Sequence, residues 1–292
     1  MPAAALASAL SPWAFRVHPE VWGEVASLAV AYWAALRLLG PRYVEPGERS
    51  ASGTQVAFFG LGLLAIVLAE GWPLSDLANN YLYSAHMVQH LLFTLAAPAF
   101  FLLGTPHWLA RVLVRRPGVW PVMRRVTRPL PALVIFNATL VTTHWPSLVD
   151  LTLHSQPVHI AVHIALFTAS IIMWWPVLSP LPELKRLPYP AQMLYLFLQT
   201  IIPTVPASFL TFASSPLYHF YATVPRVFGI SAVDDTRISG LIMKLGMGIV
   251  LWSVITVLFF RWSSKEERPE RPDVLEWQEV ERELNRTESK NP

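Results

Sequence analysis

The stretch ISGLIMKLGMGIVLWSVITVLFF, residues 238–260, decides the fold class, because its 23 residues carry a single charge, that of Lys244. A helix of about 20 apolar residues is long enough to cross the hydrocarbon core of a bilayer. A window of that length finds six further stretches of the same kind. The sequence therefore predicts an all-α integral membrane protein, a bundle of seven transmembrane helices over residues 21–39, 55–71, 85–103, 130–144, 158–178, 192–212 and 238–260.

The composition excludes the soluble classes of protein. Hydrophobic residues make up 53% of the 292 residues and charged residues 14%, whereas soluble domains carry about 25% charged residues. Residues 263–292 hold 15 of the 41 charged residues, so only 26 are spread over the preceding 262. A soluble enzyme, a nucleic-acid binder and a disordered chain are all excluded. We expect a transmembrane domain over residues 1–262 and a charged cytoplasmic tail over 263–292.

The basic residues predict the orientation in the membrane. The segments before the first span and after the second, fourth and sixth spans carry three of them, Arg16, Arg226 and Arg237, whereas the alternate segments carry 18. Basic residues concentrate in cytoplasmic segments. We therefore predict that the amino terminus lies outside and the carboxyl terminus in the cytoplasm.

Histidines gather at the predicted outer face, which holds eight of the nine. Two pairs have i, i+4 spacing, His86 with His90 and His159 with His163, so each pair shares one face of a helix. His144 closes the fourth span at the same depth. The remaining outer histidines lie in loops without fixed spacing and are interpreted as interfacial residues; they are His18, His154 and His219.

These residue types favour a metal site that contains copper. Imidazole binds Zn, Cu, Fe and Ni, and nearby thioethers shift the preference toward Cu(I). There is no cysteine in the chain, so thiolate ligands are excluded. Met243 and Met247 are spaced i, i+4 in the outer half of the seventh span, and Met87 lies inside the first histidine pair. The candidate ligands that these residue types suggest are His86, His90, His144, His159, His163 and Met243.

Two other intramembrane features bear on function. Lys244 lies about two turns inside the seventh span, where an ionisable group either snorkels to the surface or has a direct role. The run of residues 199–206 contains Pro203 and Pro206 and predicts a broken sixth helix.

A series of motifs gives the chain a resemblance to a known family. They are SAHMVQHLL at residues 84–92, AP at 97–98, LGTP at 103–106, THWP at 143–146, His159 with His163, WWP at 174–176, and DTRISGLIMK at 235–244. In this order they resemble the signature of the CtaG family of caa-type cytochrome c oxidase assembly factors. The resemblance covers roughly residues 55–260.

The resemblance implies a bacterial, multi-pass protein of the inner or plasma membrane that helps to assemble cytochrome c oxidase, binds and delivers copper, and has no enzymatic turnover. Its partners would be subunits of a terminal haem–copper oxidase and membrane lipid, without nucleic acid. The family's motif residues correspond here to His86, His90, His144, His159, His163 and Asp235, so the resemblance adds Asp235 to the candidate metal ligands.

Three alternatives remain open on the sequence. A haem-binding electron-transfer protein would take axial ligands from the third and fifth spans. A copper or proton-coupled transporter would use Lys244, Asp235 and the broken sixth helix as a pathway. A structural scaffold for the oxidase would need no metal at all.

Overall fold

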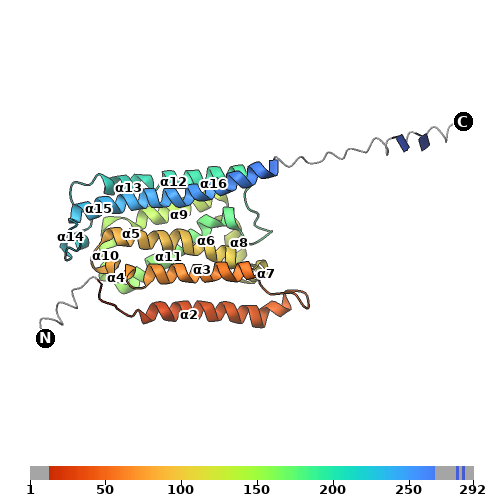
Figure 1. Ribbon diagram of the computed structural model, residues 1–292, viewed down its shortest axis with the longest axis horizontal. Coiled ribbons are helices and arrows are strands. Elements are labelled where there is room, and N and C mark those ends of the chain that lie inside the picture. The colour runs from red at the N-terminus through yellow and green to blue at the C-terminus, as the bar shows by residue number, and fades with distance from the viewer. Residues whose placement is uncertain (1–12, 267–280, 283–284, 287–292) are drawn as a thin grey trace.

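The computed structural model describes residues 13–266, 281–282 and 285–286, and it shows a bundle of long, roughly parallel or antiparallel helices (Figure 1). The described part of the chain contains helices and no strand, so the predicted all-helical class is confirmed. The helices are α2 (Pro19–Ala34), α3 (Gly53–Glu70), α4 (Leu74–Asn80), α5 (Tyr83–Leu91), α6 (Ala97–Gly104), α7 (His107–Val114), α8 (Val119–Val126), α9 (Pro129–Thr143), α10 (Pro146–His154), α11 (Gln156–Leu178), α12 (Tyr189–Ile201), α13 (Thr204–Thr211), α14 (His219–Thr223), α15 (Ala232–Leu241) and α16 (Met247–Glu266).

Short non-α turns continue several of these helices. A π-helical segment, η3 (Leu92–Ala96), joins α5 to α6, and another, η4 (Ile242–Gly246), joins α15 to α16. After α2 the chain continues through a third π-helical segment, η1 (Ala35–Leu39), and a 3₁₀ turn, η2 (Gly40–Arg42). Single π turns inside α-helices are rare and occur frequently at functional sites. Both π segments that interrupt long helices therefore mark the places where a site is to be sought.

Proline breaks the sixth predicted span, as expected. Helix α12 ends at Ile201 and α13 begins at Thr204, with Pro203 between them. Proline has no backbone N–H and clashes with the preceding turn, so the helix cannot continue unbroken. The hydroxyl of Thr204 donates to the carbonyl oxygen of Thr200 at 2.8 Å, which satisfies one of the backbone groups that the break leaves free.

Within the part of the chain that the structure describes, five helices are long and apolar enough to cross a membrane, namely Gly53–Asn80, Tyr83–Gly104, Gln156–Leu178, Tyr189–Thr211 and Ala232–Glu266. The pair α9 and α10, bent by 69° at its break, makes a sixth if it counts as one span. A multi-pass membrane protein is thus supported. Residues 21–39 are helical but are not among these spans, so the count of seven and the orientation of the termini stay predictions.

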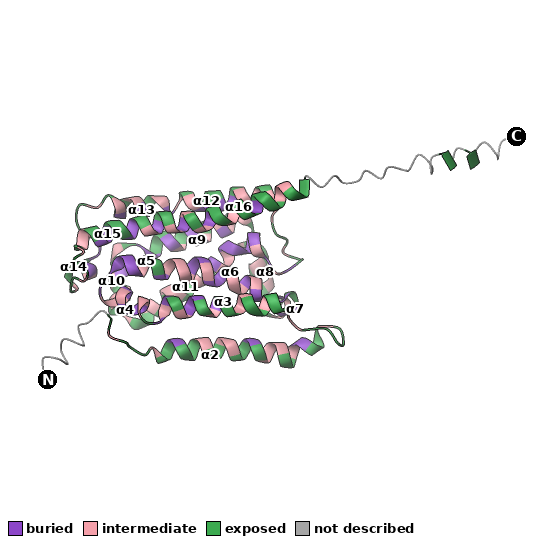
Figure 2. Cartoon of the chain, in the orientation of Figure 1, coloured by how far each residue is buried: buried purple, intermediate pink, exposed green. Residues whose placement is uncertain are grey.

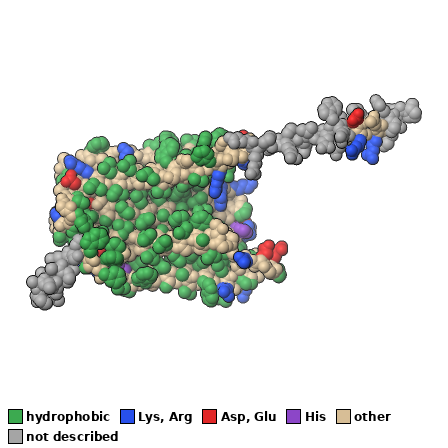
Figure 3. Space-filling view, viewed as in Figure 1, with side chains coloured by type: hydrophobic (Ala, Val, Ile, Leu, Met, Phe, Trp, Pro, Cys, Tyr) green, Lys and Arg blue, Asp and Glu red, His purple; other side chains and the backbone are tan. Residues whose placement is uncertain are grey.

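The surface agrees with a membrane setting. Figure 3 shows hydrophobic side chains over the flank of the bundle, with Lys, Arg, Asp and Glu toward its two ends. A band of this kind matches a hydrocarbon core bounded by polar interfaces. Figure 2 shows that buried residues are concentrated on the inner helices, whereas α2 at the edge is largely exposed. The core includes the fully buried Phe136, Met173, Leu196 and Leu251, from α9, α11, α12 and α16.

Helix α6 packs against α3 without side chains between their backbones. A Cβ atom on Gly104 would lie 2.5 Å from the backbone nitrogen of Phe59, so only glycine allows this approach. The hydroxyl of Tyr32 donates to the carbonyl oxygen of Gly104 at 2.8 Å and ties α2 to the same point. The last turn of α6 therefore fixes three helices relative to one another.

The bundle has two ends that differ in chemistry. One end, which we call the histidine end, contains the first turns of α5, α11 and α15 and the last turn of α9. Helices α6, α11 and α16 finish at the opposite end, where the short helices α7 and α8 also lie (Figure 1). There Arg111 donates to Glu183 at 2.7 Å, and this hydrogen bond lowers the pKa of the Glu183 carboxyl.

The boundary of the charged tail is not tested by the structure. Helix α16 continues to Glu266, past the expected boundary at residue 262. Most of the rest of the expected tail lies outside the described residues, and the division into a 1–262 domain and a 263–292 tail stays a prediction.

Candidate metal centre

The five predicted imidazoles lie together at the histidine end. His86 and His90 are in α5, His144 directly follows α9, and His159 and His163 are in the first two turns of α11. His90 is at the centre of the group. Its ring centroid is 4.3 Å from that of His86, 5.4 Å from that of His144 and 6.0 Å from that of His163. Three helices that are remote in sequence thus bring five rings into one cluster.

The two i, i+4 pairs have the geometry that the sequence predicts. The centroids of His159 and His163 lie 4.3 Å apart, as do those of the first pair, and their Nε2 atoms are separated by 2.8 Å. Nδ1 of His163 lies 3.3 Å from Oε1 of Glu70. A carboxylate beside one ring nitrogen favours a proton on that nitrogen, which leaves the other as acceptor. With the proton on Nδ1, Nε2 of His163 accepts the N–H of His159; the opposite tautomer of the pair would reverse these roles.

His144 is held in one tautomer by its own helix. Its Nδ1 lies 2.7 Å from the carbonyl oxygen of Leu140, which only accepts, so Nδ1 carries the proton. The lone pair of the neutral ring is then on Nε2, the form in which imidazole binds a metal. The hydroxyl of Tyr218 donates to the carbonyl oxygen of His144 at 3.0 Å and fixes the backbone at this point.

A small cavity connects the imidazoles to three methionines. Its volume is about 20 Å³, and its lining includes His90, His144, Met87, Met243 and Met247. This volume is about that of one water molecule or one ion. The remaining lining residues are Leu91, Thr94, Leu140 and Leu166.

The two π segments border this cavity. Thr94 in η3 donates its hydroxyl to the carbonyl oxygen of His90 at 2.6 Å, and Met243 lies in η4. Each π turn shifts the residues that follow it around the helix axis relative to a regular α-helix. Met243 and Met247 are both buried, so their thioethers are enclosed by protein. Met247, and Met87 between the two histidines of α5, join the predicted set.

Oxygen and nitrogen ligands alone do not make a metal site in this geometry. No group of three or more His, Asp or Glu side chains within the described ranges is placed to hold an ion. The cavity offers two imidazoles, and the other possible donors around it are thioethers. Soft sulfur donors combined with imidazole are suited to Cu(I) rather than to Mg²⁺, Ca²⁺ or Mn²⁺.

Asp235, which the sequence suggests as a ligand, is engaged elsewhere. It is completely buried at the start of α15. One carboxylate oxygen accepts from the backbone N–H of Tyr83 at 2.8 Å, and the other accepts from the N–H and the hydroxyl of Ser84 at 3.0 and 2.6 Å. These donors belong to the first turn of α5, whose N–H groups have no partner within the helix. The carboxylate thus caps the helix that carries His86 and His90.

Several buried polar atoms beside the cluster have no hydrogen-bond partner. They are Oε1 of Glu70, which lies 3.3 Å from Nδ1 of His163 without forming a hydrogen bond, Oε1 of Gln89, and Nδ1 of His86. The amide of Gln89 donates to the other oxygen of Glu70 at 3.0 Å, which links α5 to α3. Buried polar atoms without partners are costly, and a bound ion or water is a common explanation. Glu70 and Gln89 are not among the candidate ligands predicted from the sequence, although Glu70 is the single charged residue of the second predicted span.

The other histidines lie outside the cluster, as expected. His154 and His219 are exposed. His18 lies 2.9 Å from Asp76 and 3.0 Å from Glu20. Partial burial lowers the pKa of His18, but the hydrogen bonds to Asp76 and Glu20 outweigh burial and raise this pKa above its usual value. Lys244 is exposed on η4, which fits the snorkelling interpretation.

Comparison with protein families decides the classification. The model of the cytochrome c oxidase caa3 assembly factor family matches residues 30–265. The chain belongs to this family. The matched region of the chain contains all five clustered histidines, the three methionines of the cavity and Asp235.

Curated relatives of the chain include uncharacterized mycobacterial proteins. Proteins of Mycobacterium bovis and Mycobacterium tuberculosis are each 26% identical over 281 residues, which is 90% of this chain and 41% of the relative. A protein of Mycobacterium leprae is 24% identical over 208 residues, 65% of this chain and 31% of the relative. The chain thus spans less than half the length of these relatives. No solved structure matches it significantly.

Proposed function

We propose that this assembly factor holds a single Cu(I) ion as cargo at the outer face of a bacterial plasma membrane and passes it to a haem–copper oxidase. The observation that supports this most directly is the cavity where His90 and His144 meet Met87, Met243 and Met247. The copper is the substrate of transfer, and the protein has no turnover of its own.

The ligand chemistry favours Cu(I) over the divalent metals. The five candidate donors of the cavity are two imidazoles and three thioethers. Each imidazole is uncharged in its neutral form, and thioethers are uncharged, soft ligands. Neutral ligands around one monovalent cation are easier to keep inside a membrane protein than a site that needs several carboxylates. Asp235, Glu70 and Gln89 contribute by orienting α5 and His163 rather than by binding the ion.

The second histidine pair provides a path to the surface. His159 and His163 are partly exposed, whereas His144, Met243 and Met247 are buried. His90 contacts both His163 and His144, so the rings form a continuous series from the end of the bundle to the cavity. Copper enters and leaves by ligand exchange along this series, and an oxidase subunit docked at the histidine end receives it.

The haem alternative receives no support from the cavity volume. A macrocycle between two axial histidines needs far more room than about 20 Å³, and the rings of His90 and His163 are in van der Waals proximity. A scaffold without metal would leave the sulfur-lined cavity without a role.

The test is the metal content of the full chain purified in detergent under reducing conditions. Wild-type protein should retain up to one copper per chain and show no haem absorbance. The double variant His90→Ala, His144→Ala should lose the bound copper. The double variant His154→Ala, His219→Ala, which changes two exposed positions, should retain the copper. Equal copper in both double variants, or none in the wild type after loading with a Cu(I) complex, would overturn the proposal.

The transfer step has its own readout. In cells that lack the protein, oxidase polypeptides should accumulate with a deficit of copper, and the wild-type gene should restore the metal while the His90→Ala and His144→Ala double variant should not. Oxidase that is fully loaded with copper in the deletion strain would contradict a delivery role.

A further inference from the structure

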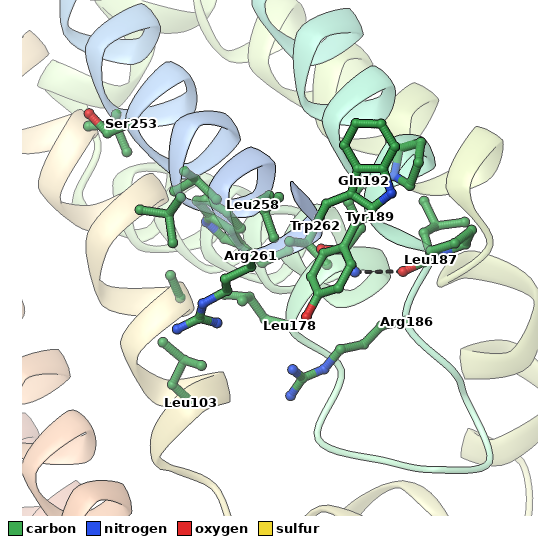
Figure 4. A pocket seen from close by; sticks show the side chains of 18 of the residues that line it. Leu103, Leu178, Arg186, Leu187, Tyr189, Gln192, Ser253, Leu258, Arg261 and Trp262 are labelled. Carbon is green, nitrogen blue, oxygen red and sulfur yellow. Dashed lines mark hydrogen bonds between the residues drawn. The ribbon is translucent and has the colours of Figure 1, made fainter. Parts of the chain in front are cut away.

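A large groove lies at the end of the bundle opposite the histidines. Its volume is about 1390 Å³, and it is lined by Phe58 of α3, by α6, the end of α11 and the start of α12, and by α16 along most of its length. None of the clustered histidines lines it. Its walls are mainly apolar, and they include Phe58, Phe100, Leu103, Val254 and Val257. Figure 4 shows side chains of α16, the α11–α12 loop and α12 around one open space.

The groove has a cationic mouth. Arg186, Arg261 and Lys265 line it together with one acid, Glu266. Nε of Arg186 donates to the carbonyl oxygen of Ser179 at 2.9 Å, which holds the side chain in place and leaves its other N–H groups available. Within the described residues, Arg261 and Lys265 have no ion-pair partner. Figure 4 shows the guanidinium groups of Arg186 and Arg261 and the hydroxyl of Tyr189 on the same side of the opening.

A further donor lies among the apolar walls. Trp174 lines the groove and is 2% exposed, and its indole Nε1 has no hydrogen-bond acceptor in the protein. A buried N–H without a partner costs free energy comparable to a lost hydrogen bond. An occupant that carries oxygen acceptors as well as apolar chains would supply the missing partner.

We propose that this groove binds one anionic phospholipid of the surrounding bilayer. The phosphate lies against Arg186, Arg261 and Lys265, and the acyl chains follow the apolar walls formed by α6 and α16. Basic pockets between transmembrane helices are a known mode of recognition of anionic headgroups. The predicted orientation places this mouth in the cytoplasmic leaflet, whose surface is negatively charged in cells.

Charge and volume together favour lipid over the other occupants. A free phosphate ion would contact only the mouth and leave the apolar walls uncovered. A helix of a partner protein would fill the walls but would not need three cations at one end. An anionic lipid satisfies both parts, and the bilayer presents it at high concentration beside the groove.

The experiment is native mass spectrometry of the full chain purified from mixed phosphatidylglycerol and phosphatidylcholine vesicles. Wild-type protein should retain one phosphatidylglycerol in preference to phosphatidylcholine. The variant Arg186→Gln, Arg261→Gln, Lys265→Gln should lose this preference, at about fivefold in affinity for each charge removed. The charge-matched control is Arg124→Gln, Arg125→Gln, Arg128→Gln, which removes three exposed cations from the same end outside the groove.

A second variant tests the walls rather than the mouth. Ala99 is a half-buried wall residue, so Ala99→Trp should obstruct the chains and lower lipid retention with all three cations intact. Gel filtration and thermal unfolding show that each variant is folded. The proposal is overturned if the triple variant and its control retain equal phosphatidylglycerol, if the two lipids are retained equally by the wild type, or if Ala99→Trp binds lipid as the wild type does.

Discussion

Asp235 on α15 accepts two hydrogen bonds from Ser84 on α5, from the backbone N–H at 3.0 Å and from the hydroxyl at 2.6 Å. These residues are 151 positions apart in the chain. The contact joins the helix that carries His86 and His90 to the helix that leads into Met243. The two halves of the candidate metal centre are thus held together by a carboxylate that need not touch the metal.

Replacing this carboxylate should weaken both folding and copper binding. Asp235→Asn removes the charge from three hydrogen bonds to the first turn of α5, and we expect a loss of about 2 kcal/mol in the free energy of unfolding. Ser84→Ala should have a smaller effect, because the two backbone N–H groups keep their acceptor. Thermal unfolding and Cu(I) titration measure the two effects. The control is Asp234→Asn at the exposed neighbouring acid; equal losses in both variants would contradict the capping role.

The thioethers of Met243 and Met247 should contribute to Cu(I) affinity and contribute little to the free energy of unfolding. Met243→Leu with Met247→Leu conserves volume, so the cost in unfolding free energy should stay below about 1.5 kcal/mol per site. Cu(I) affinity should fall at least tenfold, because leucine has no donor atom. Met173→Leu is the matched control, since Met173 is also fully buried but lies outside the cavity. A double variant that binds Cu(I) as tightly as this control would show that the sulfurs are not ligands.

Helix packing at Gly240 provides a test of the fold itself. A Cβ at this position would lie 2.6 Å from the carbonyl oxygen of Ala207 and 2.6 Å from the nitrogen of Thr211. Gly240→Ala should therefore push α15 away from α13 and cost about 1–3 kcal/mol. Gly248→Ala meets no atom within 4 Å and should be neutral or slightly stabilising, because alanine favours helix. The melting temperatures of the two variants, measured side by side, test whether α15 packs against α13 at Gly240.

The contact between His18 and Asp76 should make the start of α2 sensitive to pH. Arg16, Glu20 and Asp76 surround His18, and the carboxylates raise its pKa in the folded protein. A raised folded-state pKa means that the contribution is complete below the unfolded value of about 6.5 and is lost as pH rises through the folded value. Its size should be under about 1 kcal/mol.

Hydrogen exchange in the first turn of α2 measures this contribution. Exchange there, corrected for its intrinsic pH dependence, should become faster between pH 6 and pH 9, and His18→Gln should remove the change. If the variant keeps the wild-type profile, another group is responsible.

The orientation can be tested with single cysteines, because the chain contains none. His154→Cys lies at the histidine end and Arg125→Cys at the opposite end, and both positions are exposed. In intact cells a membrane-impermeant maleimide should label the first, and it should label the second only after permeabilisation. The reverse result would place the amino terminus in the cytoplasm and the imidazoles on the wrong side for delivery.

Local sequence patterns predicted the parts of the site that depend on one helix. His86 with His90, and His159 with His163, face the same way because helical periodicity places residues i and i+4 on one side. The break at Pro203 follows from the missing N–H of proline. Each of these is a property of a few consecutive residues, so no knowledge of the neighbouring helices was needed.

The sequence by itself determined that the chain is helical, that several of its helices are long and apolar enough to cross a membrane, and that its histidines gather at one end, because apolar length and residue spacing act along the chain. Only the tertiary structure decided that His90 is central, that Met87 and Met247 join Met243 around one cavity, and that Asp235 caps α5. Those contacts depend on which helices are neighbours and how far each is rotated. The choice of neighbouring helices and their rotation are set by close backbone packing at glycines such as Gly104 and Gly240 and by the π turns in η3 and η4. Neither effect follows a periodic pattern that can be recognised in the sequence.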